Sequence, residues 1–275
     1  MANITAAAVN ELRKRTGVGM MDCKKALVEC DGDMDKAIDY LREKGQKLAA
    51  KRADRDASEG AVLATVNADK TFAAVIMMNC ETDFVAKNED FVAFTREVLQ
   101  TAVDAKAKSL EEVMALTING LSVETMIVEQ VAKIGEKITL SHYYPIEAVA
   151  TYAYVHPGNR MASVVGLSKA GYDEEGKEMS MQVIAGRPVA LNKDSVPAEI
   201  IEREMEVYRG QVREEGKPED MVEKIAQGKL NKFFKESTLL SQEYTREAKV
   251  SVEEHLRKID NDLTITAFQR AELGE

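Results

Sequence analysis

The side chains best suited to metal binding or nucleophilic chemistry are few in this chain and lie far apart along it. The histidines and cysteines are His142, His156, His255, Cys23, Cys30 and Cys80. They show neither the Cys-x-x-Cys spacing nor the histidine spacing that metal and redox sites use. Cys23, Leu27 and Cys30 instead fall on one face of a helix. The first two thiols therefore predict helix core rather than a reactive centre.

Two short patterns resemble ligand sites but lack residues that such sites need. Asp31, Asp33 and Asp35 match the start of a calcium loop, but Lys36 stands where that loop requires glycine. The Gly-Val-Gly at residues 17–19 lacks the third glycine of a dinucleotide fingerprint, and no strand follows it closely. The sequence also contains no P-loop. We therefore predict no metal, no bound nucleotide and no other cofactor.

The most unusual local feature is the segment Glu-Thr-Asp-Phe-Val-Ala-Lys-Asn-Glu-Asp-Phe at residues 81–91. It directly follows a strand-like apolar run, where a polar turn is expected, yet Phe84 and Val85 stand between Asp83 and Lys87. One interpretation is that both apolar side chains fold back into the core, since core aromatics outnumber exposed anchors. Another is that the ring and the carboxylate project together into a partner's pocket. A third makes Asp83 the general base of an enzyme, which would require a raised pKa in a closed pocket.

The elements that must position this segment begin with a helical region, predicted as a first domain over residues 1–55. Thr5 caps a first helix that Gly17 ends, and a second helix covers about residues 20–30. Asp33 caps a third helix, which we expect to end at Gly45 and to be followed by a charged linker. Helices this short are stable only when packed together, so a three-helix bundle is predicted.

Residues 56–140 predict a first α+β subdomain. Apolar runs at residues 61–66 and 71–79 flank a turn and form a β-hairpin, and the second run is apolar on both faces. Asn88 can cap the following helix, whose buried stripe includes Phe91. The predicted helix cap would hold the residues just before it in a fixed place.

Residues 141–190 plus 237–275 predict a second α+β subdomain, with another hairpin and another helix. The last strand, near residues 262–268, is expected to join the sheet that begins near Lys137. Residues 191–236 predict an antiparallel helical hairpin inserted into this subdomain. The predicted fold class is therefore α+β: an N-terminal three-helix bundle, two α+β core subdomains with antiparallel sheets, and the inserted helical hairpin.

Composition narrows the classes of function. The 275 residues carry 37 basic and 47 acidic side chains, and the net charge of −10 disfavours direct nucleic-acid binding. The N-terminus has no apolar signal core, and no run approaches the roughly 18 apolar residues of a membrane span. These features predict a cytoplasmic protein with no membrane attachment.

Four ordered motifs make the chain similar to the bacterial elongation factor Ts family over nearly its whole length. The first is Arg-Thr-Gly-Val-Gly-Met-Met-Asp-Cys-Lys-Lys-Ala-Leu, and the second is Thr-Asp-Phe-Val-Ala-Lys-Asn-Glu-Asp-Phe. The third is Tyr-Val-His-Pro-Gly-Asn-Arg, and the fourth begins at a Gly-Lys-Pro and ends at Leu-Leu-Ser-Gln-Glu-Tyr. Their positions are residues 15–27, 82–91, 154–160 and 216–244. Several motifs in order are far more specific than any one of them.

The resemblance implies a guanine-nucleotide exchange factor and not an enzyme. Its partner would be elongation factor Tu, the GTPase that carries aminoacyl-tRNA, from which it would release GDP so that GTP enters. In the family, the second motif displaces the magnesium of the partner's nucleotide site; here it comprises Thr82, Asp83, Phe84 and Val85. Other residues matching the family's partner contacts are Arg13, Met20, Met21 and His156.

Two further expectations concern the third and fourth motifs. Pro157 stands where many relatives have glycine, which would stiffen the turn beside His156 without removing it. The helical hairpin is associated with dimerisation in some members, so a homodimer, or a heterotetramer with the partner, is a possible assembly. The alternative function is that of a structural or assembly protein that uses this hairpin as its interface.

Overall fold

The N-terminal unit is a three-helix bundle, as predicted. The computed structural model describes residues 4–275, so residues 1–3 of the predicted first domain lie outside the described residues. The helices are α1 (Ala6–Thr16), α2 (Met20–Glu29) and α3 (Met34–Lys51). The Thr5 hydroxyl caps α1 and the Asp33 carboxylate caps α3, while Gly17 ends α1 with a φ of 67°. The buried side chains between the helices include Val9, Leu12, Cys23, Leu27 and Leu41.

The prediction that Gly45 ends the third helix was wrong, because α3 continues to Lys51. Gly45 is buried where α3 crosses α7 (Val123–Ile134), and a methyl group added to it would lie 2.9 Å from the Ala132 Cβ. The glycine therefore permits a close approach of two helices. An ion pair of 2.9 Å between Arg42 Nε and Glu129 Oε1 joins the same two helices. The bundle is thus packed against the core, and the predicted linker is shorter than expected.

The first sheet contains β1 (Glu59–Val66), β2 (Phe72–Cys80) and β5 (Thr139–Glu147), paired antiparallel in the order β1-β2-β5. All nine residues of β2 are buried, which confirms the prediction of cover on both faces. One face packs on α5 (Glu89–Asp104), through residues such as Phe91 and Val98. The short elements α4 (Asp83–Ala86), α6 (Leu110–Ala115), β3 (Thr117–Ile118) and β4 (Leu121–Ser122) complete this unit with α7.

The second sheet contains β6 (Ala150–Val155), β7 (Met161–Leu167) and β8 (Ile265–Glu272), in the order β6-β7-β8. The last strand therefore does not join the sheet that begins near Lys137, and this prediction was wrong. That segment is β5, which pairs with β2, so the predicted boundary at residue 140 cuts through a strand of the first sheet. The physical reason is that β2 has a second edge of backbone donors and acceptors, which burial obliges to pair.

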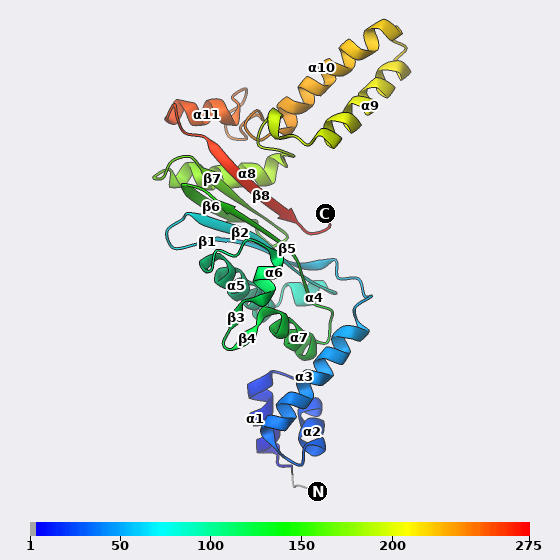
Figure 1. Ribbon diagram of the computed structural model, residues 1–275, viewed down its shortest axis with the longest axis vertical. Helices are drawn as coiled ribbons and strands as arrows, with labels where there is room; N and C mark the ends of the chain where they lie inside the picture. Colours follow the sequence, from blue (N-terminus) through cyan, green and yellow to red (C-terminus); the bar gives the residue numbers. More distant parts are fainter. Residues whose placement is uncertain (1–3) are drawn as a thin grey trace.

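The two sheets pack face to face. Val62, Val75 and Met77 of the first sheet share an apolar cluster with Val164 and Ala271 of the second. In each sheet the hairpin's second strand is central and pairs with a strand that comes later in the chain. Figure 1 shows the bundle at one end of an elongated molecule, the stacked sheets in the middle and the helical hairpin at the far end. The order of a hairpin followed by helices does occur twice, as predicted.

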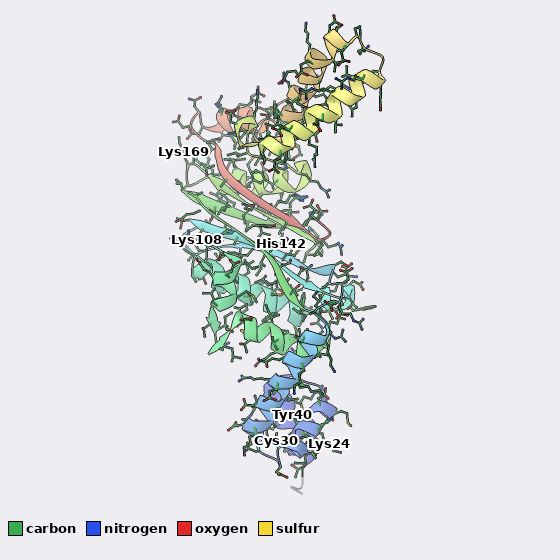
Figure 2. The ribbon with its side chains drawn as sticks, turned by 45° about the vertical axis from the view of Figure 1, so that its right-hand side comes forward. Lys24, Cys30, Tyr40, Lys108, His142 and Lys169 are labelled. Carbon is green, nitrogen blue, oxygen red and sulfur yellow. The ribbon has the colours of Figure 1, made fainter. Side chains whose placement is uncertain are left out.

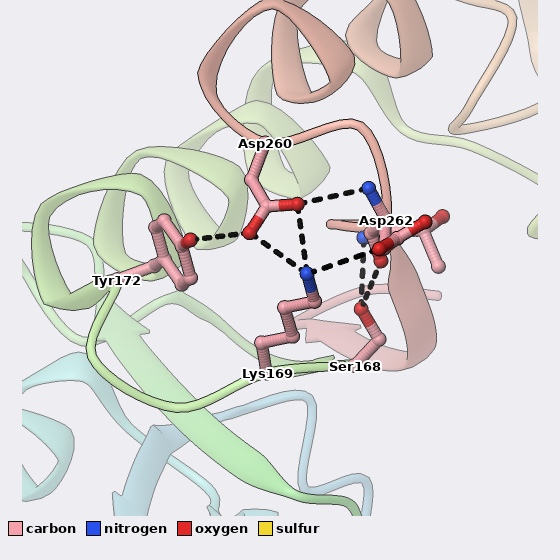
Figure 3. Close-up of polar contacts among 6 residues, drawn as sticks. Ser168, Lys169, Tyr172, Asp260 and Asp262 are labelled. Carbon is pink, nitrogen blue, oxygen red and sulfur yellow. Dashed lines mark hydrogen bonds and ion pairs between the residues drawn. The ribbon is translucent and has the colours of Figure 1, made fainter.

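Helices α8 (Asp173–Gly186) and α11 (Val252–Ile259) belong to the second unit, and a polar cluster closes it. The Lys169 ammonium donates to both carboxylate oxygens of Asp260 at 2.8 Å, and the Tyr172 hydroxyl donates to the same carboxylate at 2.6 Å. Figure 3 shows that the cluster joins the chain after β7 to the chain between α11 and β8. These two donors hold the pKa of Asp260 well below its usual range. The cluster brings together segments that the inserted hairpin separates in sequence.

The inserted hairpin consists of α9 (Ala198–Glu214) and α10 (Glu219–Ser237), preceded by the short helix η1 (Lys193–Ser195). The two helices pack through an apolar seam that includes Met205, Val212, Val222, Ala226 and Leu230. These apolar side chains are therefore used in contacts within the hairpin. Within residues 4–275 there is no helix with the length and apolar character that a membrane crossing demands.

Candidate partner-binding site

The Phe84 turn, which we define as residues 82–87, is held between two helix caps. The Thr82 hydroxyl accepts a hydrogen bond from the Val85 backbone N–H at 3.4 Å and starts the one-turn helix α4. The Asn88 carboxamide accepts from the Asp90 and Phe91 backbone N–H groups and starts α5, which confirms the predicted cap. Because one cap begins α4 and the next begins α5, the segment between β2 and α5 is limited to a single short helical turn.

Phe84 and Val85 of this turn differ sharply in exposure. The Phe84 side chain is 85% exposed, so the interpretation that it folds back into the core was wrong. Val85 does pack against the first core cluster, as that interpretation expected of both residues. The helical turn therefore uses Val85 to anchor the projection and leaves Phe84 at its tip.

The Asp83 carboxylate lies beside Phe84 on the open rim. Its Oδ2 accepts a hydrogen bond of 2.6 Å from the Lys87 ammonium, and its side chain is 48% exposed. The Lys87 donor lowers the pKa of Asp83 from its ordinary value. A general base working near neutral pH needs the opposite shift, so the geometry gives no support to Asp83 as the base of an enzyme.

A hollow of about 320 Å³ connects the Phe84 turn to the N-terminal bundle. Its lining residues are Gly17, Phe84, Val85, Asn88, Asp90, Gln130, Lys133 and Ile134. The Lys133 stem passes Gly17 so closely that an added methyl group would lie 3.0 Å from its Cδ, and the Lys133 ammonium reaches Asp90 at 3.5 Å. The start of the second motif and the end of helix α1 therefore border one depression.

Three of the predicted contact residues lie in the bundle, within four positions of Gly17, which lines this hollow. Met20 and Met21 begin α2, directly after the turn at Gly17, and their side chains are 50% and 75% exposed. Arg13 is exposed in the last turn of α1, where its carbonyl accepts from the Gly17 N–H at 2.8 Å. Adjacent large apolar side chains that are exposed are typical of an interaction surface.

His156 lies at the same end of the sheets as the Phe84 turn. It is exposed in the β6–β7 turn, and its Nδ1 lies 3.1 Å from the Tyr154 hydroxyl. Two contacts fix this turn on the start of β1: the Asn159 carbonyl accepts from the Val62 N–H at 2.8 Å, and Arg160 pairs with Glu59 at 2.7 Å. Glu59 in turn lies opposite Cys80, the last residue of β2. The Phe84 turn, which follows β2, and His156, which follows β6, therefore lie at the same end of the two sheets.

Sequence reasoning missed the residues that hold the Phe84 turn from behind. The Glu136 carboxylate accepts hydrogen bonds from Glu81 and Thr82, and the Glu81 carboxylate accepts one from Arg52. Glu136 lies 54 positions from Thr82, and no motif or local spacing connects them. Their roles follow only from the packing of α7 and β5 beside the end of β2.

The residue types usual in catalysis remain dispersed in the structure. Figure 2 shows Cys30 in the N-terminal bundle and His142 on the sheets, in different parts of the molecule. Across residues 4–275, no three His, Cys, Asp or Glu side chains gather in a way that could hold a metal ion. The exposed Phe84 ring and Asp83 carboxylate on the turn, and the exposed methionines on the bundle, are suited to contact with a macromolecule.

Comparison with known proteins places the chain among named relatives. Residues 81–275 match the family model "Elongation factor TS", and residues 1–49 match "Elongation factor Ts, mitochondrial, N-terminal". Proteins named elongation factor Ts are similar along their full length: that of Christiangramia forsetii is 50% identical over 276 residues, covering 100% of both chains. The protein of Flavobacterium psychrophilum is 47% identical with the same coverage, and that of Amoebophilus asiaticus is 46% identical over 98% of this chain.

The chain belongs to the elongation factor Ts family. It is therefore a translation elongation factor, with a role in protein biosynthesis. Within this family member, the N-terminal match covers Arg13, Met20 and Met21, and the longer match begins at Glu81 and covers the Phe84 turn.

Proposed function

We propose that this protein is the guanine-nucleotide exchange factor of elongation factor Tu, acting in the cytoplasm as a binding partner rather than as an enzyme. It would bind the GDP-bound GTPase, accelerate the release of GDP and so allow GTP to enter. The observation that carries the proposal is the Phe84 ring, 85% exposed beside an ionised carboxylate on a capped turn. A side chain that is this exposed contributes little to packing within the fold, so the ring is available for contact with a partner.

The proposed mechanism acts on the magnesium ion in the partner's nucleotide site. Phe84 would insert at the edge of that site, and the Asp83 carboxylate, whose pKa is lowered by Lys87, would enter as a negative charge. A bound magnesium ion is often the largest local charge at a phosphate site, and its loss leaves the phosphates poorly neutralised. Displacing the ion would therefore weaken GDP binding without any covalent step in this protein.

Thermodynamic coupling sets how much contact the exchange factor needs. If its binding weakens GDP binding by some factor, GDP weakens its binding by the same factor. A weakening of about 10³-fold requires about 4 kcal/mol of differential binding. Few interface residues individually contribute more than 2 kcal/mol. We therefore assign part of the binding energy to Met20 and Met21 on the bundle and to His156 in the turn of the second hairpin.

The test measures release of a fluorescent GDP analogue from elongation factor Tu in the presence of this protein. We expect Phe84→Ala to slow release by about tenfold or more, a loss of about 1.4 kcal/mol, without lowering the melting temperature. Val149→Ala is the matched control, because Val149 is 60% exposed in the turn at the opposite end of β6. If the unmodified chain fails to accelerate GDP release at micromolar concentration, the proposed function is wrong.

One observation supports the alternative of an assembly protein. The α9–α10 hairpin projects from the sheets (Figure 1), and Val207 and Met221 on it are 47% and 44% exposed. Self-association through this hairpin would give a homodimer, or a heterotetramer with two partner molecules. Light scattering at high protein concentration tests this, and a monomer would remove the alternative's main support.

A further inference from the structure

We propose that Glu136 is a positioning residue of the exchange site, which orients Phe84 toward the partner without touching it. This inference rests on the proposed exchange function and adds a residue to that site. Glu136 follows α7 directly after Gly135, behind the turn rather than on its exposed tip.

The Glu136 carboxylate uses both oxygens to hold the base of the Phe84 turn. Its Oε2 accepts from the backbone N–H groups of Glu81 and Thr82 at 3.1 and 3.0 Å. Its Oε1 accepts from the Thr82 hydroxyl at 2.6 Å. Hydrogen bonds to an ionised acceptor are stronger than those between neutral groups. Glu136 thus accepts one such bond from Glu81 and two from Thr82, the N-cap residue of α4.

The end of β2 and the segment that follows α7 accept hydrogen bonds from each other. While Glu136 accepts from the Glu81 backbone, the Glu81 carboxylate accepts from the Lys137 backbone N–H at 2.6 Å. The Glu81 side chain is only 15% exposed and also forms an ion pair of 2.6 Å with Arg52, the residue that ends α3. The carboxylates of Glu81 and Glu136 therefore connect the Phe84 turn to the end of α7 and, through Arg52, to α3 of the N-terminal bundle.

The Phe84 turn depends on these contacts because it has little packing of its own. Helix α4 has four residues, too few to be stable alone, and none of the four is fully buried. Val85 packs only partly against the core. The other polar contacts of Thr82 are local: its hydroxyl accepts from the Val85 N–H at 3.4 Å, and its carbonyl accepts from the Ala86 N–H at 3.1 Å and the Cys80 thiol at 3.2 Å. The orientation of Thr82 decides where the next residues point, so the carboxylate that orients Thr82 also orients Phe84.

Glu136 should therefore affect the rate of exchange more than the affinity. Without the Glu136 hydrogen bonds the protein would still bind the partner, but the Phe84 ring would occupy the productive position for a smaller fraction of the time. Misplacement of an interacting group by about 1 Å can reduce a rate by about 10²-fold. The bundle and the second hairpin would meanwhile keep most of their contacts with the partner.

The experiment uses the full chain in three variants and one control. Glu136→Ala removes both acceptor oxygens and so all three hydrogen bonds. Glu136→Asp keeps the charge but shortens the side chain, which tests the contact if the alanine variant folds poorly. Glu136→Gln can still accept from both backbone N–H groups and donate to the Thr82 hydroxyl, so it should rescue. The control is Glu254→Ala, which removes a carboxylate that accepts a backbone N–H at 2.9 Å in α11.

Two measurements separate this inference from the proposed function. Amide hydrogen exchange of Glu81 and Thr82 in the isolated protein reports the local contact, and fluorescent GDP release reports the maximal rate and the half-saturating concentration. For Glu136→Ala we expect faster amide exchange and a maximal rate reduced by about tenfold, with a half-saturating concentration changed by less than about threefold. Glu136→Asp should share the loss, and Glu254→Ala should not.

The opposite results are distinguishable. If the unmodified chain releases GDP and both Glu136→Ala and Glu136→Asp reach its maximal rate, this inference is wrong and the proposed function stands. A glutamine variant as slow as the alanine variant would also overturn it, because the hydrogen bonds would then not be the cause. If the unmodified chain releases no GDP, the proposed function fails and this inference fails with it.

Discussion

The close packing of α3 on α7 predicts opposite outcomes for two glycine-to-alanine substitutions. Gly45 and Gly210 both lie inside helices, so alanine at either position gains about 1 kcal/mol of intrinsic helix propensity. At Gly210 the added methyl group meets no described atom within 4 Å outside its own helical surroundings. At Gly45 it would lie 2.9 Å from the Ala132 Cβ and 3.3 Å from the Val128 carbonyl oxygen.

The magnitudes follow from these distances. Overpacking of a tight contact typically costs about 1–3 kcal/mol, so Gly45→Ala should change the free energy of unfolding by a net loss of about 0–2 kcal/mol. Gly210→Ala should instead stabilise the protein by about 1 kcal/mol. The two variants should therefore differ by about 1–3 kcal/mol, although the chemical change is identical.

Urea unfolding followed by circular dichroism measures this difference. Adding Ala132→Gly removes the methyl group that Gly45→Ala meets, so the double variant should show a favourable coupling between the two positions. If Gly45→Ala stabilises the protein as much as Gly210→Ala does, the helices do not approach closely and the bundle is not docked on α7. The hollow shared by Gly17 and Phe84 would then also lose its basis.

Two other predictions concern titrating groups. Because hydrogen bonds depress the pKa of Asp260 in the folded state, its contribution to stability is present above the unfolded pKa of about 3.9 and is lost as the pH falls through the lower folded value. Asp260→Asn should therefore lower the melting temperature at pH 7, with a gap to the unmodified chain that closes in acid; a gap independent of pH would contradict this. Burial raises the pKa of Cys80 to about 12, so its thiol should resist a thiol reagent at pH 8 until urea unfolds the protein, while the partly exposed Cys30 reacts first. Rapid labelling of Cys80 in the folded chain, read by mass spectrometry, would refute the burial argument.

The candidate site illustrates which features were accessible without the structure. Thr82 and Asn88 are recognisable as cap residues, and the motif resemblance marks the Phe84 turn. Residue types alone, however, favoured a buried Phe84, because an aromatic after an apolar strand is usually core. The exposure of Phe84 depends on whether it or its neighbour Val85 faces the sheet. That choice follows from the orientation of Thr82, which is held by Glu136, a residue 54 positions away.

The sequence by itself determined the helices, the two hairpins and the inserted helical pair, since caps, stripes and turns involve residues within about four positions of one another. Tertiary structure decided the pairing of β5 with β2, because a strand covered on both faces must pair both edges. It also decided that Gly45 serves helix packing and that Glu136 holds the Phe84 turn. These outcomes depend on contacts between residues far apart in the chain, for which local spacing carries no signal.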